Sequence, residues 1–160
     1  MAVDLEAYRS AMGSALKSQG YACVFVATTT DGNPCRLNYA TDLLGAVKRL
    51  RRTSPAQLII EDVVWLPDRS MAMMVAEHVR DQLEGHLTAG GWLSLPAPEA
   101  AQAVREATER RHRGVVTFSH DQLMARWAHG TATREDGRKR SRSRPGKRAR
   151  MAAKGLAATP

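Results

Sequence analysis

The alternation of apolar and polar stretches predicts a β-hairpin near the start of the chain. Residues 21–27 form a β-prone apolar run without Pro, and a second short run follows at 34–40. Between them stands Asp31-Gly32, and Gly tolerates the positive φ that tight turns require. We therefore expect two antiparallel strands joined at this turn.

A helix with one basic side is predicted directly after the hairpin. Thr41-Asp42 can cap it, because side-chain oxygens at this position accept bonds from the first backbone N–H groups. Its apolar face is supplied, at helical spacing, by Leu43, Leu44, Val47 and Leu50. The cations Lys48, Arg49, Arg51 and Arg52 fall elsewhere on the helix or at its end and form a basic rim.

A third strand and a second helix are expected over residues 57–87. The run 57–66 contains the unbroken apolar triplets Leu-Ile-Ile and Val-Val-Trp, which indicate burial on both faces. Asp68 or Ser70 can open the helix, whose apolar residues recur every three or four positions, and Glu77 lies on it. Gly90-Gly91 ends this part of the chain before Trp92.

Further helices are predicted on both sides of this central part. Amphipathic spacing predicts an N-terminal helix within residues 1–19. In the segment 99–133, a helix follows Pro98, and Ser119 with Gln122 has the form of a capping box that opens another. We predict an α/β (α+β) fold with a small mixed or antiparallel sheet flanked by helices.

The order of elements over residues 20–98 resembles that of the GIY-YIG nuclease superfamily. The likeness is to the small bacterial and phage branch, whose second motif reads Lys-Ile-Gly. It rests on an aromatic strand, a Gly turn, a basic-apolar-small triplet before Tyr-Ala-Thr-Asp, a Ser-Pro after the helix, and Glu77 well before Trp92. The resemblance implies the fold predicted above for residues 20–98.

The resemblance also implies a cleavage mechanism, most of whose residues are replaced in this chain. In the family, a strand tyrosine helps deprotonate water, a helix arginine steadies the scissile phosphate and a helix glutamate holds one divalent metal. By position, Phe25 replaces the tyrosine, Asn38 replaces the Gly of the second motif in Arg36-Leu-Asn38, and Ala46 replaces the arginine. Only Glu77 matches.

These replacements favour a domain that binds nucleic acid, DNA in particular, without cutting it and without a cofactor. One alternative is an active endonuclease with a rebuilt site, in which Glu77 holds Mg²⁺ or Mn²⁺ and Arg49, one helical turn from Ala46, contacts the phosphate. Another alternative is a structural or interaction module whose tail binds RNA or a different anionic partner. The domain's expected phosphate contacts are Arg36, Lys48, Arg49, Arg51 and Arg52.

All of the net charge of +8 belongs to the segment 134–160. This segment has ten Lys or Arg against two acidic residues, and the remaining chain has fourteen of each sign. It has little apolar content, so we expect a disordered tail that attracts phosphate backbones irrespective of sequence. Its expected contacts are Arg138, Lys139, Arg140, Arg142, Arg144, Lys147, Arg148 and Arg150.

The cysteines, the histidines and the hydropathy of the chain limit which kinds of metal site, disulfide and membrane segment we expect. No His-Glu-x-x-His or Cys-x-x-Cys motif suggests zinc, and Cys23 and Cys35 fall in predicted strands, where buried thiols are common. We read both as reduced in a cytoplasmic protein, nucleoid-associated if bacterial, and expect no membrane partner. The sequence leaves the oligomeric state open.

Overall fold

The protein is described by a computed structural model, which covers residues 2–5, 8, 10–54 and 56–129. The chain separates into one compact unit, Met1–Met124, and a second, Ala125–Pro160. The first unit is a mixed α+β fold. Its elements are α1 (Ser10–Ser18), β1 (Ala22–Thr29), β2 (Cys35–Ala40), α2 (Leu43–Thr53), β3 (Leu58–Leu66), α3 (Arg69–Gln82), the short 3-10 helix η1 (Glu84–His86), α4 (Ala97–Arg111) and β4 (Phe118–Ser119).

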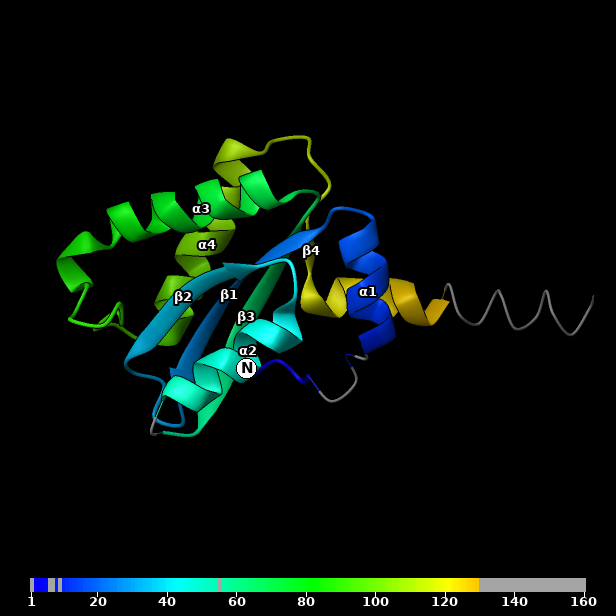
Figure 1. The fold of residues 1–160 in the computed structure, drawn as a ribbon. Coiled ribbons are helices and arrows are strands. Elements are labelled where there is room, and N and C mark those ends of the chain that lie inside the picture. Colours follow the sequence, from blue (N-terminus) through cyan, green and yellow to red (C-terminus); the bar gives the residue numbers. More distant parts are fainter. Residues whose placement is uncertain (1, 6–7, 9, 55, 130–160) are drawn as a thin grey trace, which may run out of the picture. The chain divides into compact units, whose positions relative to one another are not determined.

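The four strands form one antiparallel sheet in the order β2-β1-β3-β4, as Figure 1 shows. The predicted hairpin is confirmed: β1 and β2 pair directly, and Gly32 takes a φ of +76° in the turn between them. Its N–H donates to the carbonyl oxygen of Thr29 at 3.0 Å. The central position of β1 explains why its run 22–28 is buried throughout.

Helices α3 and α4 cover one face of the sheet (Figure 1). Alternate strand residues, such as Val24 on β1 and Leu37 on β2, pack there against Val75 of α3 and Val104 of α4. Burial of a side chain of this size is worth about 1.5–3 kcal/mol, so this cluster is a main source of the fold's stability.

Helices α1 and α2 cover the opposite face, where the remaining strand residues point. The ring of Tyr8, just before α1, stacks on Trp65 of β3 with 5.8 Å between centroids. Both side chains are buried. Cys23 of β1 is buried as well, and its thiol donates to the carbonyl oxygen of Ala40 at 3.4 Å.

The N-terminal segment differs from the helix expected within residues 1–19. The helix begins only at Ser10, and residues 2–5 have no regular secondary structure. The N–H of Val3 donates to the carbonyl oxygen of Ile60 at 2.7 Å, so the segment contacts β3 rather than continuing the helix. The amphipathic spacing of Tyr8, Met12 and Leu16 still marks buried positions, whereas Leu5 lies outside the helix.

The C-terminal part of the first unit contains the capping box that the sequence predicts. The Ser119 N–H donates to the Gln122 side-chain oxygen at 3.1 Å, and the Gln122 N–H donates to the Ser119 hydroxyl at 3.2 Å. Helical backbone follows over 120–129. The short strand β4, which precedes it, was not expected from the sequence pattern.

The expected disordered tail, with all of its predicted phosphate contacts from Arg138 to Arg150, lies outside the described residues. Within the described part of the chain, no helix is both long and apolar enough to cross a membrane.

Candidate functional site

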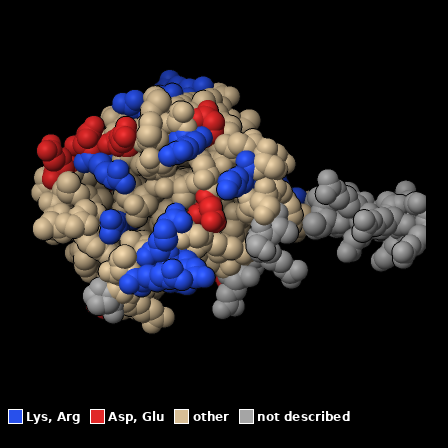
Figure 2. All heavy atoms as spheres, in the orientation of Figure 1, with Lys and Arg blue, Asp and Glu red and all other residues tan. Residues whose placement is uncertain are grey.

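The exposed side of α2 carries four cations within five consecutive residues. Leu43, Val47 and Leu50 are buried and hold the helix against the sheet. The side chains of Lys48, Arg49, Arg51 and Arg52 all lie on its exposed surface. We call these four residues the basic face of α2. Figure 2 shows Lys and Arg gathered over this helix.

A polar cap fixes the start of this helix. The Asp42 carboxylate accepts a hydrogen bond from the N–H of Gly45 at 3.0 Å, so the predicted cap is confirmed. Gly45 is required here, because a Cβ on it would overlap the Asp42 carboxylate. The cap and the buried face together set the direction in which the basic side chains point.

The four cations of the basic face are not held in ion pairs within the described part of the chain. Lys48, Arg51 and Arg52 line a groove of about 710 Å³ between α2, residues 3–5 and the start of β3. The arrangement can contact several phosphates, or another anionic surface, without breaking a salt bridge seen in this structure.

The structure brings the three motif positions on the hairpin, and a fourth on α2, to the same face of the sheet. Phe25 on β1 is buried and lies opposite Asn38 on β2. Arg36, two residues away on β2, is half-buried, and its guanidinium lies 5.9 Å from the ring centre of Trp92. Ala46 is half-buried on α2. Phe25 has no hydroxyl and is shielded from water, so it cannot activate a nucleophile.

Glu77 is not brought to these residues. It lies exposed on α3, which packs on the opposite face of the sheet from α2 and its Arg49. In the described residues, no group of three His, Cys, Asp or Glu side chains is placed to hold a metal ion. The two residues of the rebuilt nuclease site therefore stand on different sides of the molecule.

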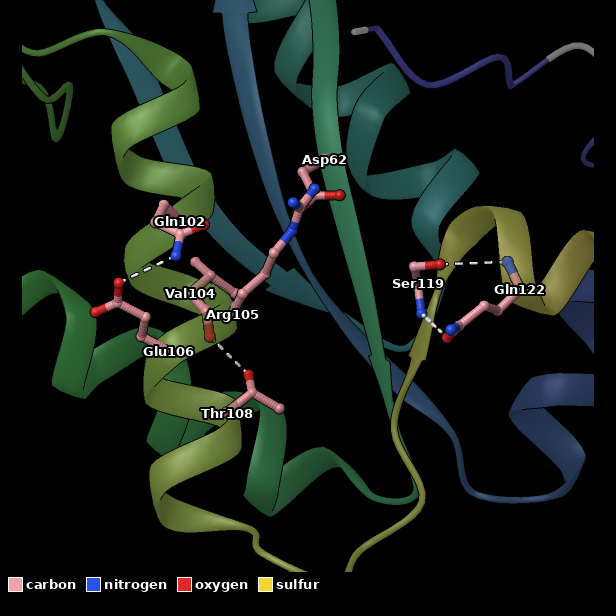
Figure 3. A network of polar contacts seen from close by, with 8 residues as sticks. All are labelled: Asp62, Gln102, Val104, Arg105, Glu106, Thr108, Ser119 and Gln122. Carbon is pink, nitrogen blue, oxygen red and sulfur yellow. Dashed lines mark hydrogen bonds and ion pairs between the residues drawn. The ribbon is translucent and has the colours of Figure 1, made fainter.

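A second polar site, which sequence reasoning missed, lies between β3, α4 and β4. Figure 3 shows Arg105 of α4 reaching toward Asp62 of β3, and its Nε donates to the Asp62 Oδ2 at 2.9 Å. This contact raises the pKa of Arg105 above its usual value, first through the hydrogen bond and then through the charge of Asp62. Asp62 itself is buried, so the ion pair is held against the sheet.

A β-bulge shapes this second site. Val26 of β1 pairs with Asp62, whereas the next residue, Ala27, pairs with Ile60, so Glu61 is an inserted residue in β3. Bulges redirect side chains, and here Glu61 and Asp62 line the same cavity although they are neighbours in a strand. In the sequence, the acidic pair Glu61-Asp62 inside an otherwise apolar strand could have indicated this second polar site.

His120 lines the same cavity and is only 3% exposed. Burial lowers its pKa from the ordinary value of 6.5, while the charge of Asp121, a hydrogen bond with the backbone of Asp4 and the charges of Asp4 and Asp62 oppose the shift. The imidazole is therefore held in its neutral form near pH 7.

Comparison with known proteins identifies no relative. No protein-family model matches the chain, and neither a curated protein nor a solved structure is detectably similar to it.

Proposed function

We propose that this protein binds DNA through the basic face of α2, and that its domain is a GIY-YIG-like module that has lost cleavage. The observation that carries the proposal is the position of Lys48, Arg49, Arg51 and Arg52, all exposed on one helix that three buried leucine and valine side chains anchor. The resemblance to the family is itself part of the proposal.

Contacts of this kind give affinity without sequence preference. Lys and Arg side chains that neutralise phosphates release condensed counterions, and this release drives binding at moderate salt. Such contacts position a protein on the duplex, whereas base-edge contacts would be needed to select a sequence. We therefore expect binding to DNA of any sequence, strongly weakened by salt.

The positions of the motif residues favour binding over cleavage. Glu77 and Arg49 lie on helices that cover opposite faces of the sheet, and a metal and a phosphate-contacting arginine must meet at one scissile phosphate. Phe25 offers no hydroxyl in the place of the family's tyrosine. A rebuilt nuclease site would need other residues, and no observation favours it.

Fluorescence anisotropy with a labelled 20-base-pair duplex tests the proposed interface. The variant replaces Lys48, Arg49, Arg51 and Arg52 by Gln in the full chain. We expect its affinity at 0.15 M salt to fall by at least about tenfold, and the slope of log affinity against log salt to become shallower by about 3 to 4.

A matched control removes four exposed arginines associated with the α3 and α4 side of the sheet. It replaces Arg69, Arg110, Arg111 and Arg113 by Gln, so that the net charge falls by the same amount. We expect a clearly smaller effect from this control. Equal losses in both variants would show that total charge matters rather than the basic face, and tighter binding to structured RNA than to the duplex would favour an RNA-binding module.

Incubation of supercoiled plasmid with the protein and Mg²⁺ or Mn²⁺ tests the lost cleavage. We expect no nicking above that of a protein-free sample, because Glu77 and Arg49 lie on helices that cover opposite faces of the sheet. Circular dichroism confirms that the protein is folded. Nicking that disappears in Glu77→Ala would instead establish an active nuclease.

A further inference from the structure

The groove beside the basic face of α2 combines cationic and apolar side chains. Its volume is about 710 Å³, and ligand sites typically have about 300–1,000 Å³. Lys48, Arg51 and Arg52 line it from α2. Four of its apolar lining residues are only half-buried, and they come from the N-terminal segment, α2 and β3: Val3, Leu5, Leu44 and Ile59. The groove therefore offers apolar contact directly beside positive charge.

The balance of charge in the groove favours an anionic ligand. Asp4 is the single carboxylate among its described lining residues, against three cations. None of these cations makes an ion pair with a described residue. A ligand with phosphates on its outside and an apolar face between them would use both kinds of side chain.

A second hollow, of about 370 Å³, adjoins the groove between α1 and α2. Leu44 and Lys48 line both spaces, so the two lie on either side of these residues. Lys17 of α1 lines the second hollow. Asp42 lines it too, and its carboxylate already accepts the N–H of Gly45. The cations thus follow a path from α2 onto α1, which suits the successive phosphates of one strand.

A single DNA strand presents the groups that this groove can contact. The bases of a duplex are paired and stacked inside it, so a pocket reaches a base only in a single strand or after the base is flipped out. Proteins that bind single strands track the backbone with cations and pack side chains on the faces of the bases. A duplex would meet the exposed cations of α2 through its phosphates alone.

We propose that this groove binds single-stranded DNA, with phosphates held by Lys48, Arg51 and Arg52 and a base packed on Leu44 and Ile59. The proposal rests on the DNA binding proposed above and names the form of DNA that the site prefers. Duplex DNA binds more weakly, because it leaves the apolar side chains of the groove without contact.

Fluorescence anisotropy with two labelled 12-nucleotide strands tests this proposal on the full wild-type chain. One strand is oligothymidine, and the other has an abasic site at every position, so both carry the same phosphates but only the first has bases. We expect oligothymidine to bind about fivefold to tenfold tighter than the abasic strand at 0.15 M salt, and also tighter than a 12-base-pair duplex.

The outcomes of this comparison separate the two proposals. Equal affinity for the two strands would overturn the binding of a base in the groove and leave DNA binding intact. Tighter binding of oligouridine than of oligothymidine would make RNA the occupant. Failure to bind either strand or the duplex would overturn the proposed function itself.

A variant with a more polar groove locates the contact. Leu44→Gln with Ile59→Thr removes apolar surface and keeps residues suited to a helix and to a strand. Its affinity for oligothymidine should fall about threefold to tenfold, whereas its affinity for the abasic strand should stay within about twofold of the parent.

The matched control, Met74→Gln with Leu87→Thr, changes two exposed apolar side chains that do not line the groove. It should bind both strands as the parent does. Equal losses in the two variants, or an equal loss for both strands in the groove variant, would overturn the assignment to this groove. The comparison of strands on the wild-type protein needs no variant, so it decides the proposal even where a substitution prevents folding.

Discussion

At the residue scale, burial decides the chemistry of the few reactive side chains. Cys23 and Cys35 are both free and buried in strands, as the sequence predicts. Burial raises the pKa of Cys35 to about 11 and that of Cys23 further still, so neither thiol ionises near pH 7. Burial also raises the pKa of Tyr8, whose ring contacts those of Trp65 and His120.

His120 gives a prediction about stability and pH. Burial lowers its folded-state pKa below 6.5, so the unfolded chain binds more protons between the lowered value and 6.5. The contribution of His120 to the free energy of unfolding is therefore complete above about pH 7. It decreases as the pH falls from 6.5 toward the lowered pKa, by less than about 1.4 kcal/mol per pH unit for one proton.

Urea unfolding at pH 7.5 and pH 5.5 measures this effect. The loss of unfolding free energy on acidification should be smaller in His120→Gln than in wild type. His86→Gln serves as the control, because His86 is exposed, and it should behave as wild type does. A pH dependence unchanged in His120→Gln would contradict the predicted role of His120.

At the element scale, the sequence pattern predicts where a helix begins better than where it ends or which strands form nearby. Asp42 and Asp68 cap α2 and α3 as expected, since a cap depends only on residues three positions apart. The helix that carries Glu77 ends at Gln82, and a single 3-10 turn takes the place of the continuation expected to residue 87. The two-residue strand β4 exists only because β3 offers it an edge.

The Asp42 cap yields a measurable prediction. Replacing Asp42 by Ala should lower the free energy of unfolding by about 1 kcal/mol, because the Gly45 N–H loses its acceptor. Urea denaturation measures the change. Asp31→Ala, in the exposed hairpin turn, has no such bond among those of the described residues and should cost less. Equal effects would show that the cap contributes little.

At the scale of the whole molecule, charge is divided between residues 1–133, which carry no net charge, and the basic segment 134–160. The folded unit still presents the basic face of α2, because exposed acidic residues such as Asp81 on α3 and Glu84 in η1 lie on other elements. We expect both the basic face and the tail to contribute to DNA affinity.

The contribution of the tail can be separated in the full-length chain. Replacing all ten of its Lys and Arg residues by Gln should make the slope of log affinity against log salt shallower by about 4 to 5, if half of them engage phosphates. Anisotropy titrations at several salt concentrations measure it. An unchanged slope would remove the tail from the interface.

Local residue patterns determined much of this protein. The order of β1, β2, α2, β3 and α3, the hairpin turn, the caps and the buried thiols all follow from contacts within a few residues, which a sequence pattern records directly. The basic side of α2 follows from helical spacing for the same reason.

Only the tertiary structure decided which side chains meet. It placed Glu77 and Arg49 on opposite faces of the sheet, since a helix's own sequence does not specify the face that it covers. It also gathered Asp62, Arg105 and His120 around one cavity, through a bulge and through packing between distant segments. Such contacts depend on how whole elements dock, and residue spacing along the chain does not encode them.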